Sequence, residues 1–135
     1  MDTPHPHLIP LPQIPDERGN LSFFEYPSQI PFEIQRTYWI YDIPGGATKG
    51  HAFKKQQEFI VALSGSFELV LHDGAAEKTL TLNRPNFGAL VPKMCWRTLK
   101  NISTNTVVLV VSDSLYDEND YVRTFDAFLT LHSNA

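Results

Sequence analysis

The chain has 135 residues, of which 42% are hydrophobic and 19% charged, a composition typical of one globular domain with its own core. Its net charge of −4 argues against non-specific nucleic-acid binding, which needs clustered positive charge. A single cysteine, Cys95, excludes an internal disulfide and is typical of a reducing cytoplasm. The first residues carry no signal-peptide pattern, and the longest apolar run, 107–111, is too short to span a membrane.

Short segments in which apolar and polar residues alternate dominate the chain, and this alternation predicts β-strands. In chain order the predicted strands are 20–26, 34–42, 57–63, 66–72, 78–82, 87–91, 96–100 and 106–112. Turn signals such as Ser64-Gly65 and Asp73-Gly74 separate them. Many short strands at this spacing predict an all-β sandwich or barrel.

The two ends of the chain depart from this pattern. Residues 1–15 are rich in proline and cannot form a central strand, so we expect a flexible arm or an edge contact with a second subunit. Residues 16–132 are expected to form one domain. Near the other end, apolar residues recur at helical spacing and predict a short C-terminal helix capped by Asp117 or Ser114. These apolar residues are Tyr121, Val122, Phe125, Phe128 and Leu129.

The most informative stretch runs from His51 to Glu58 and is followed by Gly65. It is similar to the first signature of the cupins, H-x-H-x4-E-x6-G, with Phe53 in place of the second histidine. Asn101 fits the second signature, but Arg97 stands where its histidine is expected. The resemblance implies a cupin-type jelly-roll barrel. Only two candidate metal ligands, His51 and Glu58, remain in these signatures. Because metal sites in proteins normally have three or four protein ligands, we expect no bound metal.

Longer stretches of the chain, from about residue 18 to residue 128, resemble the sugar 3,4-ketoisomerases (WxcM-like and FdtA-like cupins). They include Arg18-Gly19-Asn20-Leu21, residues 36–41, Gly50-His51-Ala52-Phe53-Lys54, Leu82-Asn83-Arg84-Pro85, Trp96-Arg97 and a Y-D-E-x-D-Y-x-R run at 116–123. The resemblance implies a homodimer that exchanges N-terminal strands. It also implies cofactor-free isomerisation of a dTDP-4-keto-6-deoxyhexose in deoxysugar biosynthesis. The family pattern R-G-x-H-A-H is altered here, since Lys49 replaces the arginine and Phe53 the second histidine.

The chemistry of a ketoisomerase suggests a role for several of these residues. His51 is the candidate base for the C3 proton, because the pKa of histidine lies near working pH. Tyr38 is the candidate relay for the hydroxyl proton. Arg97 would stabilise the oxyanion or bind the diphosphate as a fork. Further candidates for diphosphate binding are Arg36, Lys49 and Arg123, and Trp39 or Trp96 is a candidate platform for the thymine ring.

Other interpretations of the same residues stay open at this stage. Loss of the second histidine would fit a nucleotide-sugar-binding cupin without activity. A metal-dependent cupin is disfavoured by its missing ligands. Glu58 would, in a metal-free barrel, pair with a lysine or accept backbone hydrogen bonds, and either tryptophan would pack in the core or at the barrel mouth.

Overall fold

The computed structural model of the protein describes residues 4–46 and 48–134. Strands make up most of its regular structure, with one short 3-10 turn and one helix near the C-terminus. In chain order these are β1 (His7–Pro10), β2 (Gln13–Asp16), β3 (Gly19–Ser22), β4 (Arg36–Ile40), β5 (Ala52–Phe53), β6 (Glu58–Ser64), β7 (Phe67–His72), β8 (Glu77–Leu82), β9 (Phe87–Val91), β10 (Trp96–Lys100), β11 (Val107–Ser112), η1 (Glu118–Asp120), β12 (Tyr121–Val122) and α1 (Phe125–Ser133).

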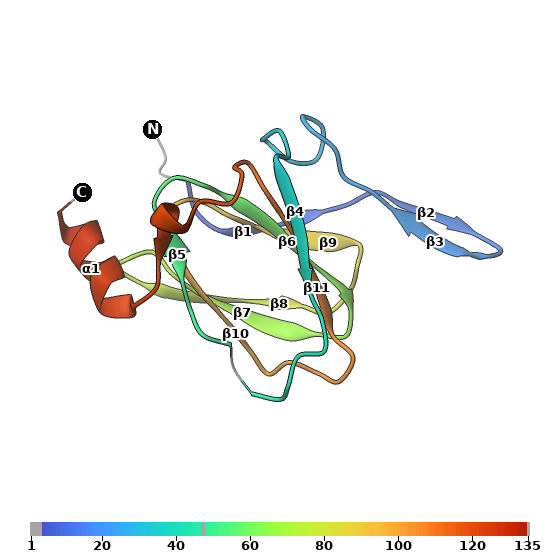
Figure 1. Ribbon diagram of the computed structural model, residues 1–135. Helices are drawn as coiled ribbons and strands as arrows, with labels where there is room; N and C mark the ends of the chain where they lie inside the picture. Colours follow the sequence, from blue (N-terminus) through green and yellow to red (C-terminus); the bar gives the residue numbers. More distant parts are fainter. Residues whose placement is uncertain (1–3, 47, 135) are drawn as a thin grey trace.

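Two antiparallel sheets face each other and form the body of the molecule (Figure 1). One has five strands in the order β1-β9-β6-β11-β4, and the other has three in the order β10-β7-β8. A two-stranded ribbon, β12 with β5, lies at the end of the body nearest α1 (Figure 1). The prediction of an all-β jelly roll with a short C-terminal helix is confirmed.

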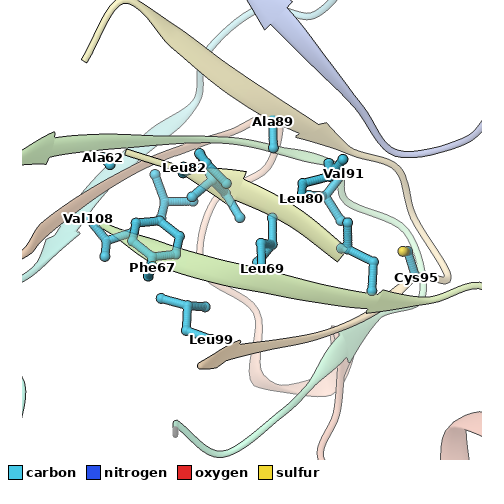
Figure 2. Close-up of a cluster of buried hydrophobic side chains, with 13 residues drawn as sticks. Ala62, Phe67, Leu69, Leu80, Leu82, Ala89, Val91, Cys95, Leu99 and Val108 are labelled. Atoms are coloured by element: carbon cyan, nitrogen blue, oxygen red, sulfur yellow. The ribbon is translucent and has the colours of Figure 1, made fainter. Parts of the chain in front are cut away.

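The main core lies between the two sheets. Strand β7 shows how the sequence builds it, because Phe67, Leu69 and Leu71 alternate with less buried residues and all point inward. They meet residues of β8 and the larger sheet, including Leu82 and Val108 (Figure 2). Each large apolar side chain buried in this way stabilises the fold by about 1.5–3 kcal/mol. The turn before β7 requires Gly65, whose φ is +74° and where a Cβ would lie 2.3 Å from Thr106 Oγ1.

The predicted strands agree with β4 and with β6 to β11 to within two residues at each end. The short strands β5 and β12 were not predicted, and the predicted start of the helix was wrong. Thr124 caps α1, with its side chain accepting a hydrogen bond from the Ala127 N–H at 3.2 Å. Asp117 instead caps η1. Tyr121 and Val122 belong to β12, because pairing with β5 buries these apolar residues in extended backbone.

The N-terminal segment forms strands at the margins of the molecule. Strand β1, which ends in Pro10, pairs with β9 at the edge of the larger sheet, where a proline is tolerated. Strands β2 and β3 form a hairpin that projects away from the body (Figure 1). Its cross-strand neighbours Ile14 and Leu21 are 52% and 56% exposed.

Helix α1 is nine residues long and packs through the fully buried Phe128. It contacts Trp96 of β10 and His72 of β7, at ring-centroid distances of 6.1 and 6.4 Å. Within residues 4–46 and 48–134, the structure contains no helix with the length and apolarity needed to cross a membrane.

Candidate active site

His51 is held at the start of β5 by the neighbouring strand β10. Its backbone forms a β-bridge with Arg97, with the His51 N–H donating at 3.1 Å and the Arg97 N–H donating back at 2.9 Å. The preceding Gly50 allows this approach, because a Cβ there would lie 2.5 Å from ring atoms of Trp96. The Gly50-His51 sequence therefore places the imidazole at a defined point beside Arg97.

The imidazole of His51 is surrounded by aromatic rings and by positive charge. The centroid of its ring lies 5.0 Å from that of the Phe53 ring and 5.6 Å from that of the Tyr121 ring. Burial, together with the positive charges of Arg97, Arg123 and Arg36, lowers the pKa of His51 to about 3. The imidazole is therefore neutral at working pH, and its buried Nε2 has no hydrogen-bond partner within the described part of the chain.

A buried ion pair lies behind this histidine. Arg97, 2% exposed, donates through Nη1 to Oε1 of Glu58, which is fully buried. The other carboxylate oxygen accepts the Tyr38 hydroxyl at 2.5 Å. Arg97 also donates to the Cys95 carbonyl at 3.2 Å, while its Nε is unpaired among the described residues. Glu58 therefore has a partner on each oxygen, and neither partner is a lysine or a backbone group.

Arg36 connects this ion pair to the C-terminal motif. Its guanidinium lies 4.7 Å from the centre of the Tyr38 ring and donates through Nη2 to the Tyr121 hydroxyl at 3.3 Å. It also lies 5.4 Å from the Tyr116 ring. Its Nε is buried and has no partner in the described ranges, so it is available to an acceptor that enters the site.

The side-chain contacts close into a ring. Each consecutive pair is in contact by a hydrogen bond, an ion pair or an aromatic or cation–π interaction, in the order His51, Phe53, Arg97, Glu58, Tyr38, Arg36, Tyr121 and back to His51. These residues lie on or next to five strands, β4, β5, β6, β10 and β12, which together span residues 36–122. The fold therefore brings together three of the predicted residues with His51, namely Tyr38, Arg36 and Arg97.

Arg123 lies beside this ring and is exposed. Its guanidinium is 4.1 Å from the centre of the Tyr121 ring and forms an ion pair with Glu118 at 2.8 Å. Glu118 also accepts the hydroxyl of Tyr116. Since both members of the ion pair are more than half exposed, an incoming anion can compete with Glu118 for Arg123.

The remaining predicted residues lie elsewhere. Trp96 is on the opposite face of β10 from Arg97, and its ring packs on Phe125 and Phe128 of α1 at 5.6 and 6.1 Å. Trp39 is 58% exposed and alternates with Tyr38 on β4, so its side chain faces away from the ring of contacting residues around His51. Lys49 is exposed two residues before His51. Among the described residues, the aromatic neighbours of the His51 ring are therefore Phe53 and Tyr121, while Trp96 packs against the backbone of Gly50 and under α1.

Sequence reasoning missed Tyr121 as a member of the site and did not find the partners of Glu58. The signal for Tyr121 was present in the Y-D-E-x-D-Y-x-R run, which sequence analysis read as part of a helix. Asp120 of that run is buried and accepts the N–H of Lys55 at 2.8 Å. This contact fixes the run against the loop that joins β5 to β6.

The absence of a metal stays a prediction. Phe53 and Arg97 occupy two of the positions that would hold ligands in a metal cupin, and the guanidinium already supplies positive charge to Glu58. Over residues 4–46 and 48–134, no group of three or more His, Cys, Asp or Glu is arranged to hold an ion.

Two facing antiparallel sheets, with a half-buried histidine beside a buried ion pair, define a cupin-type protein with a candidate catalytic site. Residues 4–133 match the family described as FdtA: WxcM-like, C-terminal, and the chain therefore belongs to this family. The resemblance inferred from the sequence motifs is confirmed.

Similar proteins include a curated enzyme and solved structures. TDP-4-oxo-6-deoxy-alpha-D-glucose-3,4-oxoisomerase of Aneurinibacillus thermoaerophilus is 37% identical over 122 residues, which cover 90% of this chain and 88% of that enzyme. A 3,4-ketoisomerase from Helicobacter canadensis is 36% identical, with a TM-score of 0.91 and coverage of 95% of this chain and 97% of that one. QdtA, a sugar 3,4-ketoisomerase from Thermoanaerobacterium thermosaccharolyticum solved with TDP, is 30% identical, with a TM-score of 0.92 and 96% coverage of both chains.

Proposed function

We propose that the protein is a sugar 3,4-ketoisomerase that converts a dTDP-linked 4-keto-6-deoxyhexose to its 3-keto isomer, with His51 as the base. The family membership and the identity to named 3,4-ketoisomerases support the reaction. The observation that carries the assignment of the base is the buried Nε2 of His51, which has no partner among the described residues. A neutral imidazole with an unused nitrogen can accept a proton from carbon.

The reaction moves two protons and needs no external oxidant. His51 removes the proton from C3, the electrons of that bond form a C3–C4 double bond, and O4 becomes an oxyanion. The hydroxyl proton of O3 is then transferred to O4. As the C3 carbonyl forms, C4 takes the proton held by His51. The substrate is thus oxidised at C3 and reduced at C4 within one molecule.

The arginines of the site supply positive charge where negative charge develops. Arg97 is buried and donates from Nη1 to Glu58 and from Nη2 to the Cys95 carbonyl, so Nε is its one guanidinium nitrogen without a partner among the described residues. This geometry favours the oxyanion role for Arg97 over a bidentate fork around diphosphate. Preorganised donors of this kind typically lower a barrier by about 3–4 kcal/mol.

Diphosphate binding falls to cations that are less buried than Arg97. Arg36 is half-buried and has an unpaired Nε within the described ranges, and Arg123 is exposed and lies over the Tyr121 ring. Lys49 is exposed two residues before His51. We assign these three residues to the diphosphate and leave Trp96 out, because its ring packs under α1.

We also propose that the enzyme works in the cytoplasm as a homodimer. The division into an arm of residues 1–15 and a cupin domain of residues 16–132 stays a prediction: residues 1–3 lie outside the described residues, and β1 joins the arm to the edge of the larger sheet. The single cysteine supports a reducing compartment. The projecting β2–β3 hairpin supports a second subunit, because its exposed apolar residues have no core of their own to cover them.

The decisive experiment is incubation with dTDP-4-keto-6-deoxyglucose, followed by NMR of the product. Wild type should form the 3-keto sugar. His51→Asn should lower turnover by about 10²–10⁴, the range for a general base, while Kd for dTDP changes little because the imidazole would contact the sugar. Full turnover by His51→Asn would move the base role to another residue, Tyr38 first. Binding of dTDP without turnover by wild type would establish the non-catalytic alternative.

A further inference from the structure

Glu58 has a role in the structure that the sequence did not suggest. It stands at the start of β6, and its carboxylate is fully buried between two other strands. Tyr38 of β4 donates to one oxygen at 2.5 Å, and Arg97 of β10 donates to the other. Burying a carboxylate is costly, so a carboxylate kept at this depth needs both partners.

The contact with Glu58 fixes the direction of the Tyr38 hydroxyl proton. Because the O–H points at Oε2, the remaining lone pairs of the phenolic oxygen are free to accept a hydrogen bond from another group. The ring itself is held by β4 and covered by the guanidinium of Arg36 at 4.7 Å. Burial, with the negative charge of Glu58, raises the pKa of Tyr38, so the phenol stays protonated at working pH.

We propose that Glu58 is a positioning residue of the isomerisation, which orients the Tyr38 hydroxyl and takes up its proton while the hydroxyl proton of the sugar moves from O3 to O4. The proposal deepens the proposed function and rests on it. Its basis is the continuous hydrogen-bonded line from Arg97 through Glu58 to the hydroxyl of Tyr38.

The protons balance along this line. The O3 hydroxyl gives its proton to the Tyr38 oxygen as the Tyr38 proton passes to Glu58. When the proton returns from Glu58 to the phenol, Tyr38 passes its own proton to O4. In the interval one negative charge has moved from Glu58 to a sugar oxygen. Arg97 bonds Glu58 and has a free Nε among the described residues, so the total charge beside it is unchanged.

A double-mutant cycle tests this line of transfer. We would measure kcat and KM for wild type, Tyr38→Phe, Glu58→Gln and the double variant with dTDP-4-keto-6-deoxyglucose. Glu58→Gln should lower kcat by at least about tenfold with little change in KM or in Kd for dTDP. The double variant should be no slower than Tyr38→Phe alone, because both residues serve one transfer.

A second substitution separates proton transfer from folding. Glu58→Asp keeps a negative charge beside Arg97, but withdraws it from the Tyr38 ring, which the strand holds in place. It should lose some thermal stability with the Tyr38 hydrogen bond, stay folded at the assay temperature and still lower kcat. The matched control for Glu58→Gln is Glu77→Gln, the same chemical change at an exposed position of β8, which should leave kcat unchanged.

The outcomes distinguish the two proposals. Wild type that leaves the keto sugar unconverted would overturn the proposed function, and the relay with it, before any variant is made. Active wild type, with Glu58→Asp at full kcat or with losses that multiply in the double variant, would overturn the relay and leave the isomerase assignment intact.

Discussion

His51 owes its proposed role to burial beside three guanidinium groups. Because these lower its pKa to about 3, the free enzyme keeps a neutral base far below the ordinary histidine range near 6.5. We expect kcat/KM at pH 5.5 to be close to its value at pH 7.5, with the acidic limb at lower pH. A pH–rate profile measures this, and an acidic limb at 6.5 or above would mean that the imidazole is solvated.

The same shift has a consequence for stability. The folded protein binds fewer protons at His51 than the unfolded chain between pH 6.5 and about 3. The contribution of the neutral imidazole is therefore complete above pH 6.5. It is lost as the pH falls through that range.

Phe53 is the residue at which this site departs most from its family pattern. It is fully buried, and its ring lies 5.0 Å from His51, 4.6 Å from Tyr121 and 5.0 Å from the Arg97 guanidinium. Phe53→His would bury a polar ring in place of a phenyl ring and lose the aromatic contact with the Arg97 guanidinium, and should lower the free energy of unfolding by about 1–3 kcal/mol.

Activity of this variant should be kept or raised, because it restores the second imidazole of the family pattern. Chemical denaturation and the NMR assay measure the two effects. A stable but inactive Phe53→His protein would show that the aromatic ring itself shapes the sugar pocket. Phe53→Leu is the matched control for loss of the ring without a new polar group.

At the scale of elements, the loop between β5 and β6 is anchored by one carboxylate. Asp120, 5% exposed, accepts hydrogen bonds from the N–H of Lys55 at 2.8 Å and from the backbone and side chain of Gln56, both at 3.2 Å. Asp120→Ala leaves these donors unpaired, so we expect a loss of about 1–3 kcal/mol in the free energy of unfolding. Denaturant titration measures this loss. The control is Asp117→Ala, which removes an exposed N-cap of η1 and should lower the free energy of unfolding by less.

The strands were predictable from sequence because the alternation of apolar and polar residues indicates which face of a strand is buried. In β7, buried and half-buried residues alternate along the whole strand. The two residues of β12 were not, because their apolar spacing fits a helix equally well. Only pairing with β5 decides between the two.

The site was predictable in part for a similar reason. The cupin signature and the family resemblance pointed to His51, Tyr38 and Arg97, but alternation on one strand cannot say which residue of another strand lies opposite. The pairing of Glu58 with Arg97 across 39 positions, and of Arg36 with Tyr121 across 85, depends on the order of strands in the folded sheets.

For the whole molecule, the projecting β2–β3 hairpin is the feature that is most unexpected in a monomer, because it exposes apolar side chains to solvent. Ile14 and Leu21 pair across it and are both more than half exposed, although burial of each would be worth about 1.5–3 kcal/mol. We expect a homodimer at micromolar concentration by light scattering, in which this hairpin contacts the second subunit. Ile14→Lys with Leu21→Lys should shift the protein to monomer without unfolding it.

Deleting residues 2–14 should also weaken the dimer, with the added loss of β1 from the edge of the larger sheet. Leu131→Lys is the matched control, because Leu131 is likewise an exposed apolar residue, and its helix α1 lies at the opposite end of the molecule from the hairpin (Figure 1). This control should stay dimeric. Wild type that scatters as a monomer would refute the assembly, and a dimer that survives both hairpin changes would place the interface on another surface.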